Sequence, residues 1–207
     1  MFRMLVAEQK CRFLLLSAFV LCWSVLFCGC DRKEEKETVR DLGAAWFQVS
    51  ADGLGTAANG VIEVCAKEKN VLGVRILAEV QIGPADFGGV AFSLPNGCRL
   101  ERVACTWPES NDAPGYDQPV NVLTTAGDSE KYTTVVEIGR RRDKIPIGGG
   151  TGTVVIEASV PWNGSDRTTA LSFGADCGAM ERNGYVIMGI DHREIIVELK
   201  SAVWMSF

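Results

Sequence analysis

Side chains able to perform acid, base or nucleophilic chemistry are scarce in this chain. Its 207 residues include one histidine, His192, so a Ser-His-Asp or Cys-His device would have to use that imidazole. No Gly-x-Ser-x-Gly motif marks a hydrolase nucleophile, and no Cys-x-x-Cys pair indicates zinc. The segment 191–194, DHRE, separates two apolar runs and is typical of a charged hairpin turn. We therefore expect no catalytic residue, metal site or cofactor.

The segment most able to hold a ligand is the Pro-rich stretch 108–119, PESNDAPGYDQP, which follows a tryptophan. It combines aromatic rings with amide and carboxylate groups, a set that can stack a sugar ring, grip a peptide or supply oxygen ligands to calcium. Loops of this length are often functional, and an ordinary loop anchored by a tryptophan is the alternative. The ligand-binding candidates are Trp107, Asn111, Asp112, Tyr116 and Asp117.

A basic cluster stands out because the chain as a whole is acidic. Lys and Arg total 21 against 26 Asp and Glu, a formal charge of -5 that disfavours general binding to nucleic acid. The segment 140–144, RRRDK, is a candidate for contact with anionic lipid headgroups or acidic envelope polymers. A solvated turn is the alternative. The candidates are Arg140, Arg141, Arg142 and Lys144.

The glycine-rich run 148–153, GGGTGT, is similar to the phosphate loop of tubulin-type GTPases. Glycines in such loops lead into a helix whose free N–H groups face phosphate. Here they precede Val154, Val155 and Ile156, which are typical of a strand, and no lysine follows them as in a P-loop. We therefore expect a flexible hairpin or bulge and no nucleotide.

The first thirty residues have the layout of a signal peptide. Arg3, Lys10 and Arg12 precede an uncharged run of 15 residues over 13–27, shorter than the roughly 20 residues that span a bilayer. The run ends in Leu-Phe-Cys-Gly-Cys, which resembles the lipobox of bacterial lipoproteins, where the leader is cut before a cysteine that is then acylated. This resemblance implies lipidation of Cys30 and a lipid-anchored position on the extracytoplasmic face of the cell membrane. An uncleaved anchor helix is the alternative.

Eight cysteines occur, of which three would leave with the leader while Cys30 would hold lipid. The remaining four are an even number in an exported domain, which indicates two disulfides with three possible pairings. Cys98 and Cys105 are an odd number of residues apart, which argues mildly against their pairing with each other. Buried reduced thiols are the alternative. The disulfide candidates are Cys65, Cys98, Cys105 and Cys177.

The rest of the chain reads as a charged tether followed by antiparallel strands. Residues 31–41 carry nine charges in eleven positions and have almost nothing to bury. From about Ala45 onward, apolar runs of period two, such as Val74, Ile76 and Ala78, alternate with Gly and Asn turns. We expect Trp46, Trp162 and Trp204 to pack on the sheets or at their edges. The expected strands cover 61–66, 72–82, 89–94, 100–107, 120–124, 132–138, 153–160, 169–173, 185–190 and 194–199.

These runs predict an all-β domain in which two antiparallel sheets pack as a β-sandwich, immunoglobulin-like or jelly-roll, because a single open sheet would leave one apolar face wet. The predicted units are a lipoprotein signal peptide over 1–29, a tether over 30–44 and the sandwich over 45–207. Two segments, 86–94 (DFGGVAFSL) and 148–158 (GGGTGTVVIEA), resemble cohesin and related carbohydrate-binding sandwiches. The dockerin-binding and planar-aromatic sugar-binding signatures of those families are not identifiable.

Together these features predict a membrane-anchored extracytoplasmic binding or adhesion module whose ligand is a carbohydrate or an envelope protein. A structural envelope lipoprotein is the second hypothesis, working through strand edges or the basic loop. An envelope hydrolase is the third.

Overall fold

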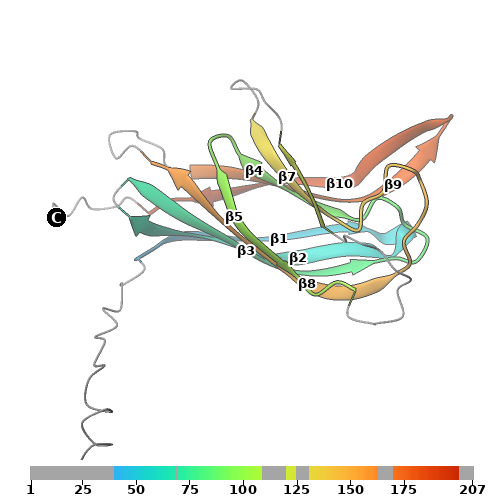
Figure 1. Ribbon diagram of the computed structural model, residues 1–207, viewed down its shortest axis with the longest axis horizontal. Helices are drawn as coiled ribbons and strands as arrows, with labels where there is room; N and C mark the ends of the chain where they lie inside the picture. Colours follow the sequence, from blue (N-terminus) through green and yellow to red (C-terminus); the bar gives the residue numbers. More distant parts are fainter. Residues whose placement is uncertain (1–39, 69, 109–119, 125–130, 163–169, 201–207) are drawn as a thin grey trace, which may run out of the picture. The chain divides into compact units, whose positions relative to one another are not determined.

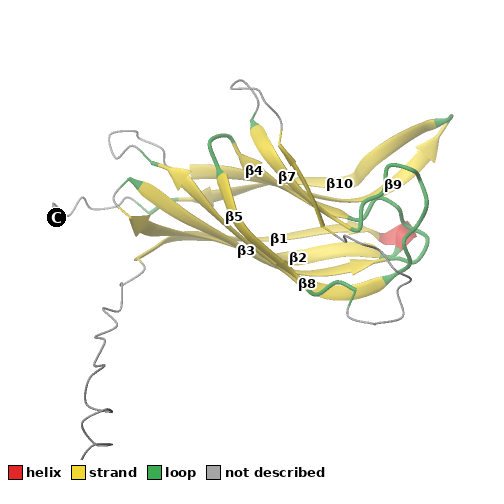
Figure 2. Ribbon diagram, viewed as in Figure 1, coloured by secondary structure: helices red, strands yellow, loops and turns green. Residues whose placement is uncertain are grey.

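The computed structural model describes residues 40–68, 70–108, 120–124, 131–162 and 170–200, which belong to one compact unit. Within these ranges the chain forms ten strands and a single 3-10 turn, η1 (Asp52–Leu54). Figure 2 colours the strands yellow and this turn red. No helix in the described residues is long and apolar enough to cross a membrane. The strands are β1 (Arg40–Ala51), β2 (Thr56–Glu68), β3 (Val71–Ile82), β4 (Val90–Pro95), β5 (Arg99–Cys105), β6 (Val120–Thr124), β7 (Tyr132–Ile138), β8 (Gly150–Pro161), β9 (Ala170–Arg182) and β10 (Tyr185–Glu198).

The strands form two five-stranded sheets that pack face to face (Figure 1). Sheet A has the order β1-β2-β3-β8-β5 and sheet B the order β10-β9-β4-β7-β6. Every neighbouring pair is antiparallel. The predicted two-sheet antiparallel β-sandwich is therefore confirmed.

Side-chain alternation builds the core between the two sheets. In β3, Val74, Ile76 and Val80 are buried, while Arg75 and Glu79 between them are exposed. Sheet B contributes two buried aromatic side chains, Phe92 on β4 and Phe173 on β9. The Phe92 ring contacts the Phe47 ring of sheet A edge to face, with 5.9 Å between the ring centroids. Each fully buried aliphatic or aromatic side chain contributes about 1.5–3 kcal/mol, so this interior is the main source of stability.

The first strand, β1, is not among the predicted strands. β1 starts at Arg40, five positions before the predicted domain start at Ala45, so part of the charged segment belongs to sheet A. Leu42 is 3% exposed and secures this end in the core. Gly43 is required there because a Cβ would lie 2.3 Å from the carbonyl oxygen of Glu198. Residues 30–39 of the predicted tether lie outside the described part of the chain.

The last two predicted strands are one continuous strand, so the hairpin turn expected at His192 is wrong. β10 runs without interruption through this segment, and His192 pairs with Asp176 on β9. The register instead shifts between Met188 and Asp191, where Gly189 has a φ of 69°. This β-bulge absorbs one extra residue without ending the strand.

Candidate binding groove

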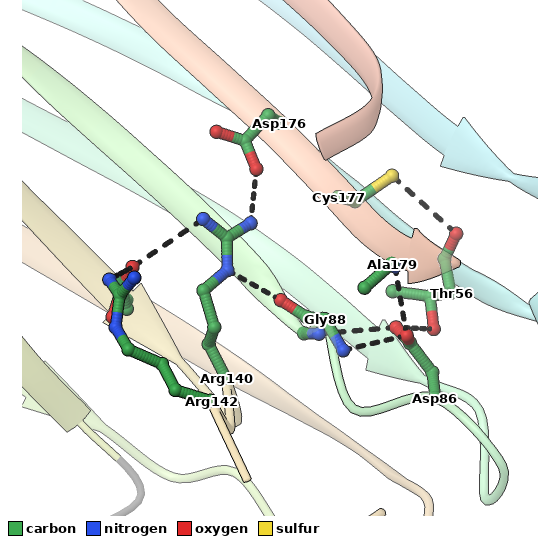
Figure 3. A network of polar contacts seen from close by, with 10 residues as sticks. Thr56, Asp86, Gly88, Arg140, Arg142, Asp176, Cys177 and Ala179 are labelled. Atoms are coloured by element: carbon green, nitrogen blue, oxygen red, sulfur yellow. Dashed lines mark hydrogen bonds and ion pairs between the residues drawn. The ribbon is translucent and has the colours of Figure 1, made fainter. Parts of the chain in front are cut away.

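A buried carboxylate fixes the loop between β3 and β4. Asp86 is 0% exposed and accepts hydrogen bonds from the Thr56 hydroxyl at 2.7 Å and from the backbone N–H groups of Gly88, Gly89 and Ala179 at 2.8, 3.1 and 3.1 Å. Figure 3 shows these contacts converging on its side chain. Asp86 thereby joins β2 and β9, which belong to different sheets. Sequence reasoning missed this residue, although an aspartate two and three positions before glycines is a local signal for such a loop.

A second polar network lies on the outer face of sheet B and is centred on Arg140 (Figure 3). Its Nε donates to the carbonyl oxygen of Gly88 at 2.6 Å, Nη2 pairs with Asp176, and Nη1 lies 3.5 Å from Glu137. In the strand register, Ala91 on β4 lies between Asp176 on β9 and Glu137 on β7. The arginine therefore spans a small residue and joins the strands on either side of it.

This arrangement corrects one of the predicted contacts with anionic surfaces. Arg140 is 7% exposed and is held by two carboxylates, so its guanidinium is not available to a lipid headgroup or an envelope polymer. The other three basic candidates are more exposed, and each faces an acidic partner. Arg141 pairs with Asp143, Arg142 with Glu137 at 2.8 Å and Lys144 with Glu181 at 3.3 Å.

The arginines form one wall of an open groove of about 620 Å³. Its other wall is β6, through residues 120–123, and Glu137 on β7 joins the two walls. Val122 and Leu123 in this groove are 46% and 37% exposed. The groove therefore combines apolar side chains of a strand with exposed guanidinium groups.

The four sheet edges differ in how they are protected. The edges formed by β1 and β10 meet each other, because the Lys200 N–H donates to the Leu42 carbonyl at 2.8 Å and the Ser50 N–H donates to Asp191 at 2.9 Å. β5 carries three exposed charged residues, which discourage pairing with another strand. β6, with the sequence VNVLT, has no charge, and none of the described strands lies on its outer side. Among the described edges, β6 is thus the one open to an added strand.

Of the five predicted ligand-binding residues, the structure describes only Trp107. Trp107 is 4% exposed, and its indole Nε1 donates to the Gly150 carbonyl at 3.0 Å. Gly152 packs beneath it, where a Cβ would lie 2.5 Å from the Trp107 Cα. Trp107 is therefore a core residue without an exposed face for a sugar. The other ligand candidates, Asn111, Asp112, Tyr116 and Asp117, lie outside the described residues.

A different tryptophan is exposed, contrary to its predicted role in packing. Trp46 on β1 is 81% exposed and lies on the outer face of sheet A. Trp46 belongs to a row of cross-strand neighbours that spans all five strands of the sheet. The adjacent row on the same face contains ion pairs between Arg75 and Glu157 at 3.3 Å and between Arg102 and Glu157 at 3.8 Å. The Trp46 row consists of Trp46, Val61, Leu77, Val155 and Ala104. Trp162 packs against the core as predicted, and Trp204 lies outside the described residues.

The four cysteines predicted to form disulfides are free thiols. From Cys65 the strand register crosses β3 and β8 before it reaches Arg99, the neighbour of Cys98, which is a separation of about 14 Å. A disulfide requires Cα atoms within about 7 Å. Cys105 lies at the opposite end of β5 from Cys98, and Cys177 lies on sheet B. The structure therefore gives no support to the two predicted disulfides, and all four cysteines lie in it as free thiols.

The thiols have little nucleophilic character. Burial raises the pKa of Cys98 and of Cys177 to about 12, and burial also raises the pKa values of Cys65 and Cys105. The thiolate is the reactive form, so these groups stay unreactive near neutral pH. In the described part of the chain, no three His, Cys, Asp or Glu side chains are placed to hold a metal ion.

The glycine-rich run enters a strand, as its sequence predicts. Gly148 has a φ of 88°, and β8 begins at Gly150. No helix N-terminus faces this loop in the described residues, so the geometry that holds phosphate in the GTPase loop is not formed.

Comparisons with known proteins add no relative to this description. No protein-family model and no curated protein matches the chain.

Proposed function

We propose that this protein is a lipid-anchored, extracytoplasmic binding module that captures an extended segment of another envelope protein along β6. The observation that carries the proposal is the uncharged edge of β6 beside the groove lined by Arg140–Asp143. An edge strand presents a row of unpaired N–H and C=O groups, which an extended segment can satisfy by adding a strand to the sheet. Main-chain hydrogen bonds then give affinity, and the flanking side chains give specificity.

The side chains of β6 suit this mode of binding. Val120 packs against the core, and Val122, on the same side of the strand, is 46% exposed at the edge. An added strand with apolar residues beside these two valines would extend the sandwich interior and remove the exposed apolar surface from water. A protein ligand is favoured over a sugar at the Trp107 end because that indole is buried.

The anchor is the second part of the proposal. Acylation at Cys30 would leave residues 31–39 between the lipid and β1, a reach of at most about 30 Å when fully extended. The domain would therefore work close to the membrane surface. Replacing Cys30 with Ser is expected to abolish incorporation of labelled palmitate and to release the protein from the membrane fraction. Unchanged labelling of this variant would refute the anchor.

Strand addition is tested by placing a charge on the edge. A display library of ten-residue peptides is selected on the purified full-length protein, and the selected peptides are measured against Val122→Lys and Gln48→Lys. Gln48 is exposed on sheet A and provides the matched control. We expect Val122→Lys to weaken binding by about tenfold or more and Gln48→Lys to leave it unchanged, because an edge lysine opposes strand pairing. Equal affinity for both variants, or no selected peptide, would refute the proposal.

A second candidate function rests on the exposure of Trp46. An indole 81% exposed beside the neutral polar residues Gln48 and Asn59 can stack a sugar ring and hydrogen-bond its hydroxyl groups. The charged side chains Arg75, Arg102 and Glu157 on this face are paired with one another, which suits a neutral ligand. A glycan array probed with wild type and Trp46→Ala tests this candidate. Sugar binding that is lost in the variant would support it, and binding retained by the variant, or absent in wild type, would exclude it.

A further inference from the structure

The strand register of sheet B specifies one position on a segment bound at β6. Asp176, Ala91, Glu137 and Asn121 form a single row across β9, β4, β7 and β6, on the outer face of the sheet. A strand added to β6 would continue this row with one residue about 4.8 Å from Asn121, pointing to the same face. The residues before and after it would lie beside Val120 and Val122 and would point toward the interior.

Arg142 is an exposed charged group in the groove beside that position. Its Nη2 lies 2.8 Å from Glu137, the cross-strand neighbour of Asn121, and Arg142 and Asn121 line the same groove. The Arg142 side chain is 64% exposed while that of Glu137 is only 4% exposed, so the guanidinium is open to solvent although its carboxylate partner is buried. The row ends at Asn121, and the neighbouring carboxylate of Glu137 carries an exposed guanidinium in the same groove.

The charges in the groove leave Arg142 only partly compensated. Glu137 is shared between Arg142 and Arg140, while Arg140 has a further carboxylate partner in Asp176. Three arginines and two carboxylates line the groove. A guanidinium has five N–H donors in a planar fork that matches a carboxylate, so one bond to Glu137 does not exhaust it.

On the basis of the proposed function, we infer that the segment bound at β6 carries Asp or Glu in the row of Asn121, where Arg142 binds it, between two apolar residues beside Val120 and Val122. The recognised element is therefore apolar-acidic-apolar in an extended conformation. The edge of β6 supplies main-chain hydrogen bonds, and Arg142 sets the identity of the middle residue. A charge-assisted pair of this kind is stronger than a neutral hydrogen bond and more selective in geometry.

The test is a reversal of charge preference. The display selection is carried out in parallel on the full-length wild type, Arg142→Glu and Lys144→Glu. We expect the wild type to enrich Asp or Glu between apolar residues and Arg142→Glu to enrich Lys or Arg at the same position. Lys144→Glu should keep the acidic preference, because Lys144 belongs to the same loop but does not line the groove. For a selected acidic peptide, we expect Arg142→Glu to weaken binding by about tenfold or more.

Further measurements keep the outcomes distinct. If Arg142→Glu does not fold, Arg142→Gln replaces it and should abolish the acidic preference without reversing it. Alternating apolar peptides with no acidic preference, or a preference unchanged in Arg142→Gln, would overturn this inference and leave strand addition at β6 standing. Failure to select peptides that are sensitive to Val122→Lys would remove the proposed function itself. Binding of phosphatidylglycerol vesicles that depends on Arg142, without peptide selection, would overturn the inference and assign this arginine to an anionic lipid surface.

Discussion

Replacing Asp86 should cost more stability than any exposed acidic substitution in this fold. Its carboxylate is fully buried and accepts four hydrogen bonds, three of them from backbone N–H groups that cannot turn elsewhere. Asp86→Ala removes the acceptor and leaves these donors buried. The loop between β3 and β4 would then lose the carboxylate contacts that join it to β2 and β9.

The magnitude follows from the number of donors left unsatisfied. Each buried unsatisfied donor costs about 1–3 kcal/mol, so three backbone groups at the lower end of that range give about 3–4 kcal/mol. Asp86→Asn keeps one oxygen, and the Thr56 hydroxyl can rotate to accept from the new amide. We therefore expect a loss of about 2 kcal/mol for Asn. A typical domain has about 5–15 kcal/mol in total, so both effects are easily measured.

Urea unfolding of the purified protein in detergent, followed by circular dichroism and tryptophan fluorescence, measures these losses. Asp143→Ala is the control, because Asp143 is exposed in the arginine loop and should change stability by less than about 0.5 kcal/mol. The reasoning fails if Asp86→Ala lowers the free energy of unfolding by less than about 1 kcal/mol, or if the Ala and Asn variants are equally stable.

Two further predictions concern the tryptophans and the thiols. Trp107→Ala should lower the free energy of unfolding by about 3–5 kcal/mol because it empties a core position, whereas Trp46→Ala should change it by less than about 0.5 kcal/mol, and equal effects in urea unfolding would contradict this assignment. Because burial raises the pKa of Cys98 and Cys177 from 9.0 to about 12, the unfolded chain releases these protons first, and their contribution to stability is lost as pH rises from 9 toward 12. Both thiols should resist iodoacetamide at pH 8 until the protein unfolds, and rapid modification of the folded protein, read by mass spectrometry, would contradict their burial.

Local periodicity was sufficient to predict the strands whose two faces differ. In β3 the contrast between Ile76 inside and Arg75 outside is carried by neighbouring residues, so the sequence predicts its orientation. β1 escaped prediction because its outward residues include Ala44 and Trp46, which do not look polar. The single β10 was divided because His192 and its charged neighbours resemble a turn, although they lie on a strand at the edge of sheet B.

The candidate site was harder to predict because it depends on contacts between distant segments. The arginine loop was found from its charge, but the burial of Arg140 depends on Asp176, which lies 36 positions away in the sequence. The orientation of Trp107 likewise depends on Gly150 and Gly152 in another strand. The cysteines were predicted to pair because the sequence gives their number and not their separation across sheet A.

The position of β1 in sheet A has a mechanical consequence. Tension between a membrane anchor at the amino end and a partner held at β6 would enter the domain through β1 and leave it through sheet B. β1 is paired with β2 along nearly its whole length, from Arg40 to Ala51. A force directed along β1 would load many of these hydrogen bonds together in shear instead of breaking them one after another. We therefore expect the pairing of β1 with β2 to resist mechanical unfolding.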